Sequence, residues 1–270
     1  MNISQFMTFV HSIQPLYVLS GLVVGMLVGI TGVGGGSLMT PILILLFGIH
    51  PATAVGTDLL YASATKTAGT LVHGYNRTID WRVVGRLALG SVPMTALTIY
   101  VLSILNVDSP TTQAMITKVL GVALVFTALS LFFRKPLTRL YGRRVGELNP
   151  KLVRNLTILT GAVLGVLVSI SSVGAGAIGV TALILLYPTM PASRIVGSDI
   201  AHAVPLTLVA GLGHWLVLGS IKWLVLQSLL VGSLPGIIVG SVLAARVPDA
   251  AVRITLGVTL LLVCARFWFF

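Results

Sequence analysis

The chain has 270 residues, of which 56% are hydrophobic and 9% are charged, and its mean hydropathy is +1.04. Soluble domains carry about 25% charged residues, so a water-soluble globular protein is excluded. The formal net charge of +11 does not indicate nucleic-acid binding, because seven of the 17 Lys and Arg residues are gathered in residues 134–154. A short basic segment between apolar runs is instead typical of a cytoplasmic loop in a membrane protein.

The apolar runs predict helices along the whole chain. Several of them reach the roughly 20 residues that span the hydrocarbon of a bilayer, and none alternates as a barrel strand would. The sequence therefore predicts an all-α polytopic integral membrane protein with roughly 8–10 membrane segments, in the cell membrane. In chain order the expected helices are 16–33, 38–47, 52–72, 81–105 and 112–133, then 156–173, 178–187, 192–218, 223–245 and 251–270.

An internal duplication divides the chain. Residues 21–48 and 161–188 are identical at 13 of 28 positions. The same order of motifs follows in both copies, with Val-Gly-Thr-Asp at 55–58 matched by Val-Gly-Ser-Asp at 196–199. We therefore expect a first transmembrane repeat at 1–133, a basic cytoplasmic loop at 134–154 and a second transmembrane repeat at 155–270.

The relative orientation of the two repeats has two solutions. With the basic loop inside, inverted repeats place Arg194, Arg246 and Arg253 inside, whereas parallel repeats place Lys222 and Arg266 there. The positive-inside rule thus favours inversion by three residues to two. Inverted repeats with interrupted helices are the plan of many secondary transporters. Eight full spans in two parallel sets of four are the alternative.

Several motifs of the first repeat occur together in one known family. Gly-Val-Gly-Gly-Gly at 32–36, Pro41 before an aliphatic run, Ala-Val-Gly-Thr at 54–57 and His73 ahead of Asp-Trp-Arg resemble the sulfite exporter TauE/SafE family of membrane permeases. The resemblance implies a permease that moves sulfite, sulfonates or other organosulfur anions, usually outward. The family commonly has a hydroxyl residue after Gly-Thr, where this chain has Asp58 and, in the repeat, Asp199.

The two glycine-rich interruptions are the predicted substrate-binding site. Adjacent glycines unwind a helix readily, and the N–H groups that start the following helix can bind an anion. Close packing between helices is the alternative role of such glycines. The candidate substrate-binding residues are Thr31, Gly34, Gly35, Gly36, Ser37, Lys66, Ser171, Gly174, Ala175 and Gly176.

Charged residues inside the predicted spans suggest two further roles. Lys66 is the only Lys or Arg deep in a predicted span, so it is a candidate for anion recognition or a structural partner of Asp58. Asp58 and Asp199 are candidates for proton carriage, with capping of helix N-termini as the alternative. His202 lies one turn after Asp199 and can relay a proton to it. The candidate coupling or gating residues are Asp58, His73, Asp199, His202 and His214.

These features together indicate a secondary transporter, an exporter, for a small sulfur-containing anion. No ATP-binding motif or metal-binding spacing occurs, so no cofactor is expected, and uncoupled export driven by the membrane voltage is an alternative to proton coupling. The expected partners are the small anionic substrate and the lipid bilayer, without nucleic acid, and a homo-oligomer stays open. An intramembrane enzyme that uses Asp58 and Asp199 as a catalytic pair, or a permease for another small anion, is the competing function.

Overall fold

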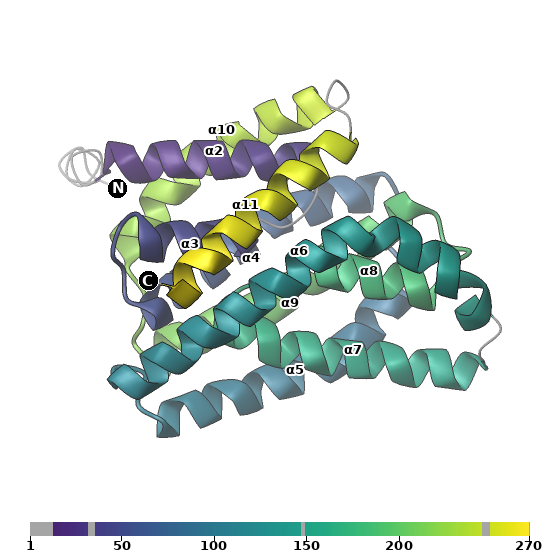
Figure 1. Cartoon of the computed structure of the whole chain (residues 1–270), viewed down its shortest axis with the longest axis horizontal. Coiled ribbons are helices and arrows are strands. Elements are labelled where there is room, and N and C mark those ends of the chain that lie inside the picture. The colour runs from purple at the N-terminus through teal and green to yellow at the C-terminus, as the bar shows by residue number, and fades with distance from the viewer. Residues whose placement is uncertain (1–12, 32–35, 147–148, 245–248, 270) are drawn as a thin grey trace.

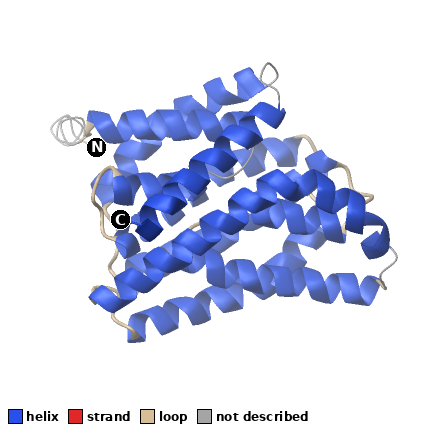
Figure 2. Cartoon of the chain, in the orientation of Figure 1, coloured by secondary structure: helices blue, strands red, loops and turns tan. Residues whose placement is uncertain are grey.

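The computed structural model describes residues 13–31, 36–146, 149–244 and 249–269, and helices are the regular secondary structure throughout these ranges (Figure 2). The first repeat contributes α2 (Pro15–Thr31), α3 (Gly36–Leu45), α4 (Pro51–Tyr75), α5 (Trp81–Ile104) and α6 (Pro110–Gly146). The second repeat contributes α7 (Pro150–Ser171), α8 (Ala177–Leu186), α9 (Ala192–Leu216), α10 (Trp223–Ala244) and α11 (Asp249–Phe269). The all-α polytopic fold is therefore confirmed.

Local signals set many of the helix boundaries. Pro51 occupies the first turn of α4, where the missing N–H has no intrahelical partner to lose. The Asp80 side chain accepts hydrogen bonds from the backbone N–H groups of Arg82 and Val83, and it thereby caps α5. Asn149 caps α7 in the same way through Lys151. The short helices α3 and α8 have ten residues each, about half of a membrane span.

The basic segment 134–154 differs from the expected loop. Helix α6 continues through it to Gly146, and α7 already begins at Pro150. Arg, Lys and Leu favour helix in this segment, whereas Pro136 and Gly142 do not, so helix propensity alone does not explain why α6 continues. Its cytoplasmic position and its role as the boundary between the repeats stay predictions.

Five of the described helices contain windows long and apolar enough to cross a membrane: Trp81–Ile104, Pro110–Phe133, Pro150–Ser171, Ala192–Leu216 and Trp223–Gly240. Helix α4, at the centre of the molecule, is not among them, because Asp58, Lys66 and several hydroxyl residues lower its hydropathy. A helix that is enclosed by other helices needs no uniformly apolar surface. The polar residues of α4 therefore mark the interior of the protein.

The two repeats exchange their first helices. Helix α2 packs along α10 of the other repeat, and α7 packs along α5, so that Figure 1 shows these pairs at opposite edges of the molecule. The homologous helices α4 and α9 pack against each other between the two pairs. Helices α3 and α8 lie beside α4 and α9 of their own repeats. The core of the protein is thus built jointly by both repeats.

Glycines permit the close approach in these pairs. A Cβ on Gly21 would collide with the backbone of Leu229, and one on Gly232 with the backbone of Val18. Gly161 lies in the same way against the backbone of Leu87. These glycines outside the predicted breaks therefore serve helix packing, as small residues commonly do in membranes.

The contacts also define the directions of the helices. Gly161 and Gly165 of α7 meet residues 87 and 91 of α5, so these two helices run parallel, and α2 and α10 do likewise. Gly56 of α4 meets His214 near the end of α9, whereas Gly69 meets Ile200 near its start. The homologous helices α4 and α9 therefore run antiparallel.

Candidate functional site

The repeated Gly-Thr-Asp and Gly-Ser-Asp motifs lie where α4 and α9 meet the opposite repeat. A Cβ on Gly56 would collide with the carbonyl oxygen of Ser220, and one on Gly197 with the carbonyl oxygen of Thr78. Because these two glycines have no side chain, α4 can contact the turn that follows α9, and α9 can contact the turn that follows α4. The motif therefore positions the two repeats against each other.

The hydroxyl residue of each motif strengthens this contact. Thr57 Oγ1 accepts a hydrogen bond from the backbone N–H of Lys222 at 3.2 Å. Ser198 Oγ accepts one from the backbone N–H of Asp80 at 2.8 Å. We call these two hydrogen bonds the cross-repeat contacts. They attach the start of α10 to α4, and the start of α5 to α9.

The aspartates of the motifs turn toward the half-helices of their own repeats. Asp58 is fully buried, and its Oδ2 accepts a hydrogen bond from Thr40 Oγ1 of α3 at 2.5 Å. Asp199 is 1% exposed and lies against Gly179 of α8, whose missing side chain makes room for the carboxylate. Among the described residues, neither oxygen of Asp199 has a hydrogen-bond partner. A buried polar group without a hydrogen-bond partner carries a desolvation cost, so burial of the carboxylate costs more free energy at Asp199 than at Asp58.

The capping role considered for these aspartates is wrong for the helices that carry them. Helix α4 begins at Pro51 and α9 at Ala192, so both carboxylates project from the second turn or beyond, where backbone N–H groups are already engaged. The predicted helix starts at 52 and 192 agree with the structure to within one residue. The distance of the two aspartates from those starts therefore excludes capping.

Lys66 lies between the two aspartates and the second glycine break. Its side chain is 6% exposed, and Nζ donates a hydrogen bond to the carbonyl oxygen of Ala175 at 3.2 Å. The ammonium group interacts electrostatically with both Asp199 and Asp58. The ion pair found in the described part of the chain is Arg194–Asp80, so Lys66 makes no direct ion pair with Asp58 there. Lys66 thus forms a buried charged cluster with Asp58 and Asp199.

The second glycine break connects this cluster to the start of α8. Ser172 and Gly174 adopt positive φ angles of 57° and 122°, which end α7 and turn the chain. Gly176, with φ of 128°, precedes the first residue of α8. A residue with a side chain is strained at φ values such as those of Gly174 and Gly176, so glycine suits these two positions. The Ser172 hydroxyl lies beside Asp58, which brings the break of one repeat next to the carboxylate of the other.

The first glycine break is only partly described. Gly34 and Gly35 lie outside the described residues, and for Thr31 and Gly36 the structure gives the backbone as the end of α2 and the start of α3. Ser37 lies in the first turn of α3. Leu38 and Met39 of α3 belong to the same buried cluster as Val173 and Ala177 at the second break. The starts of α3 and α8 therefore lie in one part of the core.

Ser171 does not face the cluster with its hydroxyl. Its Oγ donates a hydrogen bond to the carbonyl oxygen of Leu167 at 2.7 Å and accepts one from the backbone N–H of Val173 at 3.2 Å. Ser171 thus stabilises the turn that ends α7. Its neighbour Ser172 lies closer to the charged groups.

The three candidate histidines have different surroundings. His214 is fully engaged, because Nε2 lies 3.0 Å from the carbonyl oxygen of Ser169 and Nδ1 lies 3.0 Å from Ser220 Oγ. His73 Nδ1 contacts Thr78 Oγ1 at 2.8 Å, the same contact in the other repeat, but its ring is only half-buried.

His202 is the histidine closest to the charged cluster. Its Nε2 lies 2.9 Å from Ser91 Oγ, and Lys66 acts on it electrostatically. Among the described residues, its Nδ1 has no hydrogen-bond partner. His202 therefore has one free ring nitrogen, which His214 lacks.

Two cavities flank the central pair of helices. The larger, of about 480 Å³, lies among α2, α4, α9 and α10. Lys66 lines it at one point and His73 at another, about two turns further along α4. The remaining walls include Val28, Ala68, Val72, Ile200, Ile238 and Val242.

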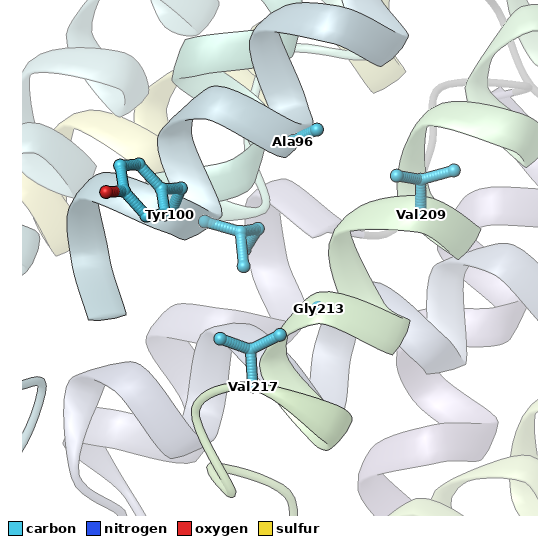
Figure 3. Close-up of a pocket in the computed structure, with 6 residues that line it drawn as sticks. Ala96, Tyr100, Val209, Gly213 and Val217 are labelled. Carbon is cyan, nitrogen blue, oxygen red and sulfur yellow. The ribbon is translucent and has the colours of Figure 1, made fainter. Parts of the chain in front are cut away.

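The smaller cavity, of about 270 Å³, lies between α5 and α9. Figure 3 shows Ala96 and Tyr100 of α5 facing Val209, Gly213 and Val217 of α9 across it. In the internal duplication, Val209 corresponds to Ala68, and Ala96 and Tyr100 correspond to Ile238 and Val242 of the larger cavity. The two cavities are therefore repeat-related, but only the larger one reaches the charged cluster.

Sequence reasoning missed several residues of this site. Thr40 donates a hydrogen bond to Asp58, and Ser91 contacts His202. Gly179 lies against Asp199, and Ser172 lies beside Asp58. Thr57 and Ser198 carry a sequence signal that could have identified them, since each precedes an aspartate at matching positions of the duplication. The others lie on different helices from their partners, and no spacing along the chain reveals them.

A helical bundle with two interrupted segments, a buried charged cluster and a cavity that reaches it defines a membrane transporter. The sequence profile of the sulfite exporter TauE/SafE family matches residues 17–267, and the chain belongs to that family. It is 43% identical over 196 residues to the "Probable membrane transporter protein YjnA" of Bacillus subtilis (strain 168), which covers 72% of this chain and 76% of that protein.

A second relative is more distant. The chain is 26% identical over 212 residues to the "Probable membrane transporter protein MJ0441" of Methanocaldococcus jannaschii, over 76% of this chain and 73% of that protein. No solved structure matches the chain. The family membership and these relatives agree with a membrane protein that acts on a small substrate in a lipid environment.

Proposed function

We propose that this protein is a secondary transporter that exports a small sulfur-containing anion, such as sulfite or an organosulfonate, across the cytoplasmic membrane. The observation that carries the proposal is the position of Lys66, a buried cation between the larger cavity and the second glycine break. A charge inside a membrane protein is costly and usually functional. An anion that enters the cavity would meet this cation first.

Lys66 retains capacity for a ligand. An ammonium group has three hydrogen-bond donors, and in the described part of the chain one of them is used, on Ala175. The start of α8 lies two residues further along the break, and its N-terminal dipole favours a negative charge. Lys66 and the start of α8 would thus bind the anion together.

The aspartates suggest how protons would be coupled to the anion. With both carboxylates ionised, Asp58, Asp199 and Lys66 together carry one net negative charge, which repels an anion at short range. A proton on one carboxylate removes this repulsion, so proton binding and anion binding favour each other. Asp199 is the better candidate carrier, because it lacks hydrogen-bond partners among the described residues and His202 is on the same face of α9. An anion that leaves with a proton moves electroneutrally, so its own concentration gradient drives export.

The helix directions support an inverted arrangement of the repeats. Homologous helices α4 and α9 are antiparallel, and the Arg194–Asp80 ion pair of 3.9 Å places the start of α9 at the same end as the turn after α4. The positive-inside rule would make this end cytoplasmic. The larger cavity then opens on the cytoplasmic side, and its smaller repeat-related counterpart lies on the outer side. Exchange between these two access routes would give alternating access.

Flux in proteoliposomes tests the proposed function. The purified protein should carry sulfite or an organosulfonate, and acidifying the compartment that the anion leaves should accelerate its exit. Lys66→Ala should lower anion binding about 10-fold or more, since hydrogen bonds to charged groups contribute about 1.5–3 kcal/mol. Lys222→Ala is the matched control, because the Lys222 side chain is exposed and only its backbone contacts Thr57. Equal flux in protein-free and protein-containing liposomes for every anion would refute the proposal.

A further inference from the structure

We infer that the ligand of the larger cavity is a monovalent organic anion with an apolar body of several carbon atoms, whose charged group lies at Lys66. The inference rests on the proposed function and narrows its substrate class. It follows from the size of the cavity, from the chemistry of its walls and from the charge around Lys66.

The cavity is larger than an inorganic oxyanion requires. Its volume is about 480 Å³, which falls within the roughly 300–1,000 Å³ range of pockets that enclose whole organic ligands. Sulfite has four heavy atoms and would leave most of this volume to water. Apolar walls bind water poorly, so an apolar portion of the ligand fills this space more favourably.

The described walls offer one Lys or Arg as an anchor. Of the lining residues, Thr65, Lys66 and His73 carry polar side chains. The Thr65 hydroxyl donates to the carbonyl oxygen of Tyr61 at 3.0 Å, and the His73 ring contacts Thr78 at 2.8 Å. The Thr65 hydroxyl and the Nδ1 atom of His73 are thus engaged locally. Lys66 is the charged side chain among the lining residues, so it is the anchor for a charged group.

Apolar side chains line the rest of this space, which is open on one side, since Val72 and Ile238 are 61% and 67% exposed. Val28 of α2, Val72 of α4, Ile200 of α9 and Ile238 of α10 contribute to the walls from four different helices. A ligand with charges or hydroxyls along its length would lose its hydration there without new hydrogen bonds. The ligand that fits these walls thus has one charged end and an apolar body.

The charge around Lys66 limits the ligand to a single negative charge. Asp58 and Asp199 already act on the ammonium group from the protein side. A proton on one carboxylate makes Asp58, Asp199 and Lys66 neutral together. A bound monoanion then leaves one uncompensated negative charge, whereas a dianion leaves two, which costs more. The site therefore selects monoanions such as alkanesulfonates or alkanecarboxylates.

A homologous series of ligands tests the inference. We would measure binding of methane- to pentanesulfonate to the full-length protein in lipid nanodiscs by calorimetry. Each buried methylene contributes about 0.8 kcal/mol, so the dissociation constant should fall about fourfold per methylene. Lys66→Gln, measured in the same nanodiscs, reports partitioning into lipid, and its signal is subtracted. A dissociation constant that stays level or rises with chain length overturns the inference.

A cavity-filling substitution localises the effect. Ala68→Phe places a ring in the cavity and should abolish the dependence on chain length, whereas Leu71→Phe, on the exposed face of the same helix, should retain it. Retention of the full slope in a folded Ala68→Phe protein would overturn the location. If the protein transported sulfite but its binding of the alkanesulfonates did not depend on their chain length, this inference would be overturned and the proposed function would stand. Absence of flux for every anion would overturn both.

Discussion

The hydroxyl oxygen of Ser198 accepts a hydrogen bond from the backbone N–H of Asp80 at 2.8 Å, and so joins α9 of the second repeat to the turn that starts α5 of the first. The equivalent contact between Thr57 and Lys222 joins the repeats at the other end of α4. Both contacts lie next to a glycine that touches the opposite turn. The same three-residue motif therefore attaches each repeat to the other and carries the buried aspartate.

Substitution of the motif glycine should destabilise the protein. A Cβ on Gly197 would overlap the carbonyl oxygen of Thr78, which is backbone and cannot move aside cheaply. We expect Gly197→Ala to lower the free energy of unfolding by about 2 kcal/mol or more, measured by thermal unfolding in detergent. Gly85→Ala is the control, since nothing lies within 4 Å of the added Cβ, and alanine should stabilise α5 there. Equal melting temperatures for Gly197→Ala and the parent would contradict the packing described for this motif.

Labelling of single cysteines should reveal the orientation of the repeats. In a Cys264→Ala background, cysteines in place of Arg77 and Arg194 should react with a membrane-impermeant reagent from the same side, because the turn after α4 adjoins the start of α9. A cysteine in place of Lys222 should react from the opposite side, because the backbone of Lys222, just before α10, contacts Thr57 near the start of α4. If the cysteines at 77 and 194 were labelled from opposite sides, the inverted arrangement would be wrong.

Removal of the carboxylate charges should separate transport from coupling. Asp58→Asn and Asp199→Asn retain the size of the side chain. If a carboxylate carries the proton, the Asn variant should keep anion exchange and lose its acceleration by a pH gradient. We expect this loss in at least one variant, and first at Asp199. The measurement is anion flux with and without an imposed gradient. Parental responses in both variants would favour export driven by the membrane voltage.

The two repeat-related histidines should differ in their effect on stability. His214 is 1% exposed, and both of its ring nitrogens have partners. His214→Ala therefore removes the partner of the Ser169 carbonyl, while the Ser220 hydroxyl keeps only its bond to the backbone carbonyl of residue 214. We expect a loss of about 3 kcal/mol for His214→Ala and of about 1 kcal/mol for His73→Ala, whose ring is half-buried. Chemical denaturation in mixed micelles measures both. Equal losses would show that burial does not distinguish the pair.

Most helix boundaries could be predicted from the sequence, because apolar length and the positions of proline and glycine determine them. Helix α5, expected at 81–105, spans Trp81–Ile104, and α9, expected at 192–218, spans Ala192–Leu216. The prediction of a loop was wrong after residue 133. That segment is too basic for a span and contains Pro136 and Gly142, yet α6 continues through it to Gly146.

The partners within the site could not be predicted in the same way. The bond between Thr40 and Asp58 depends on how α3 is rotated about its axis, and that rotation is set by packing against α4. Asp199 lies against Gly179, whereas Asp58 has a hydroxyl partner in Thr40, so the matched motifs of the duplication have different environments. Local spacing identifies which residues are unusual, whereas tertiary packing decides what they touch.

The exchange of first helices between the repeats has an evolutionary consequence. Helix α2 finds its long packing partner in α10, and α7 finds its partner in α5, so neither repeat covers its own first helix. A half-length ancestor would have exposed the glycine-lined face of that helix unless a second copy of the same polypeptide supplied the partner. Such an ancestor would need to assemble as a homodimer, with its assembly dependent on protein concentration. In the single chain this dependence is absent and the two copies can differ, as they do where one carries Lys66 and the other has Thr207 at the matching position.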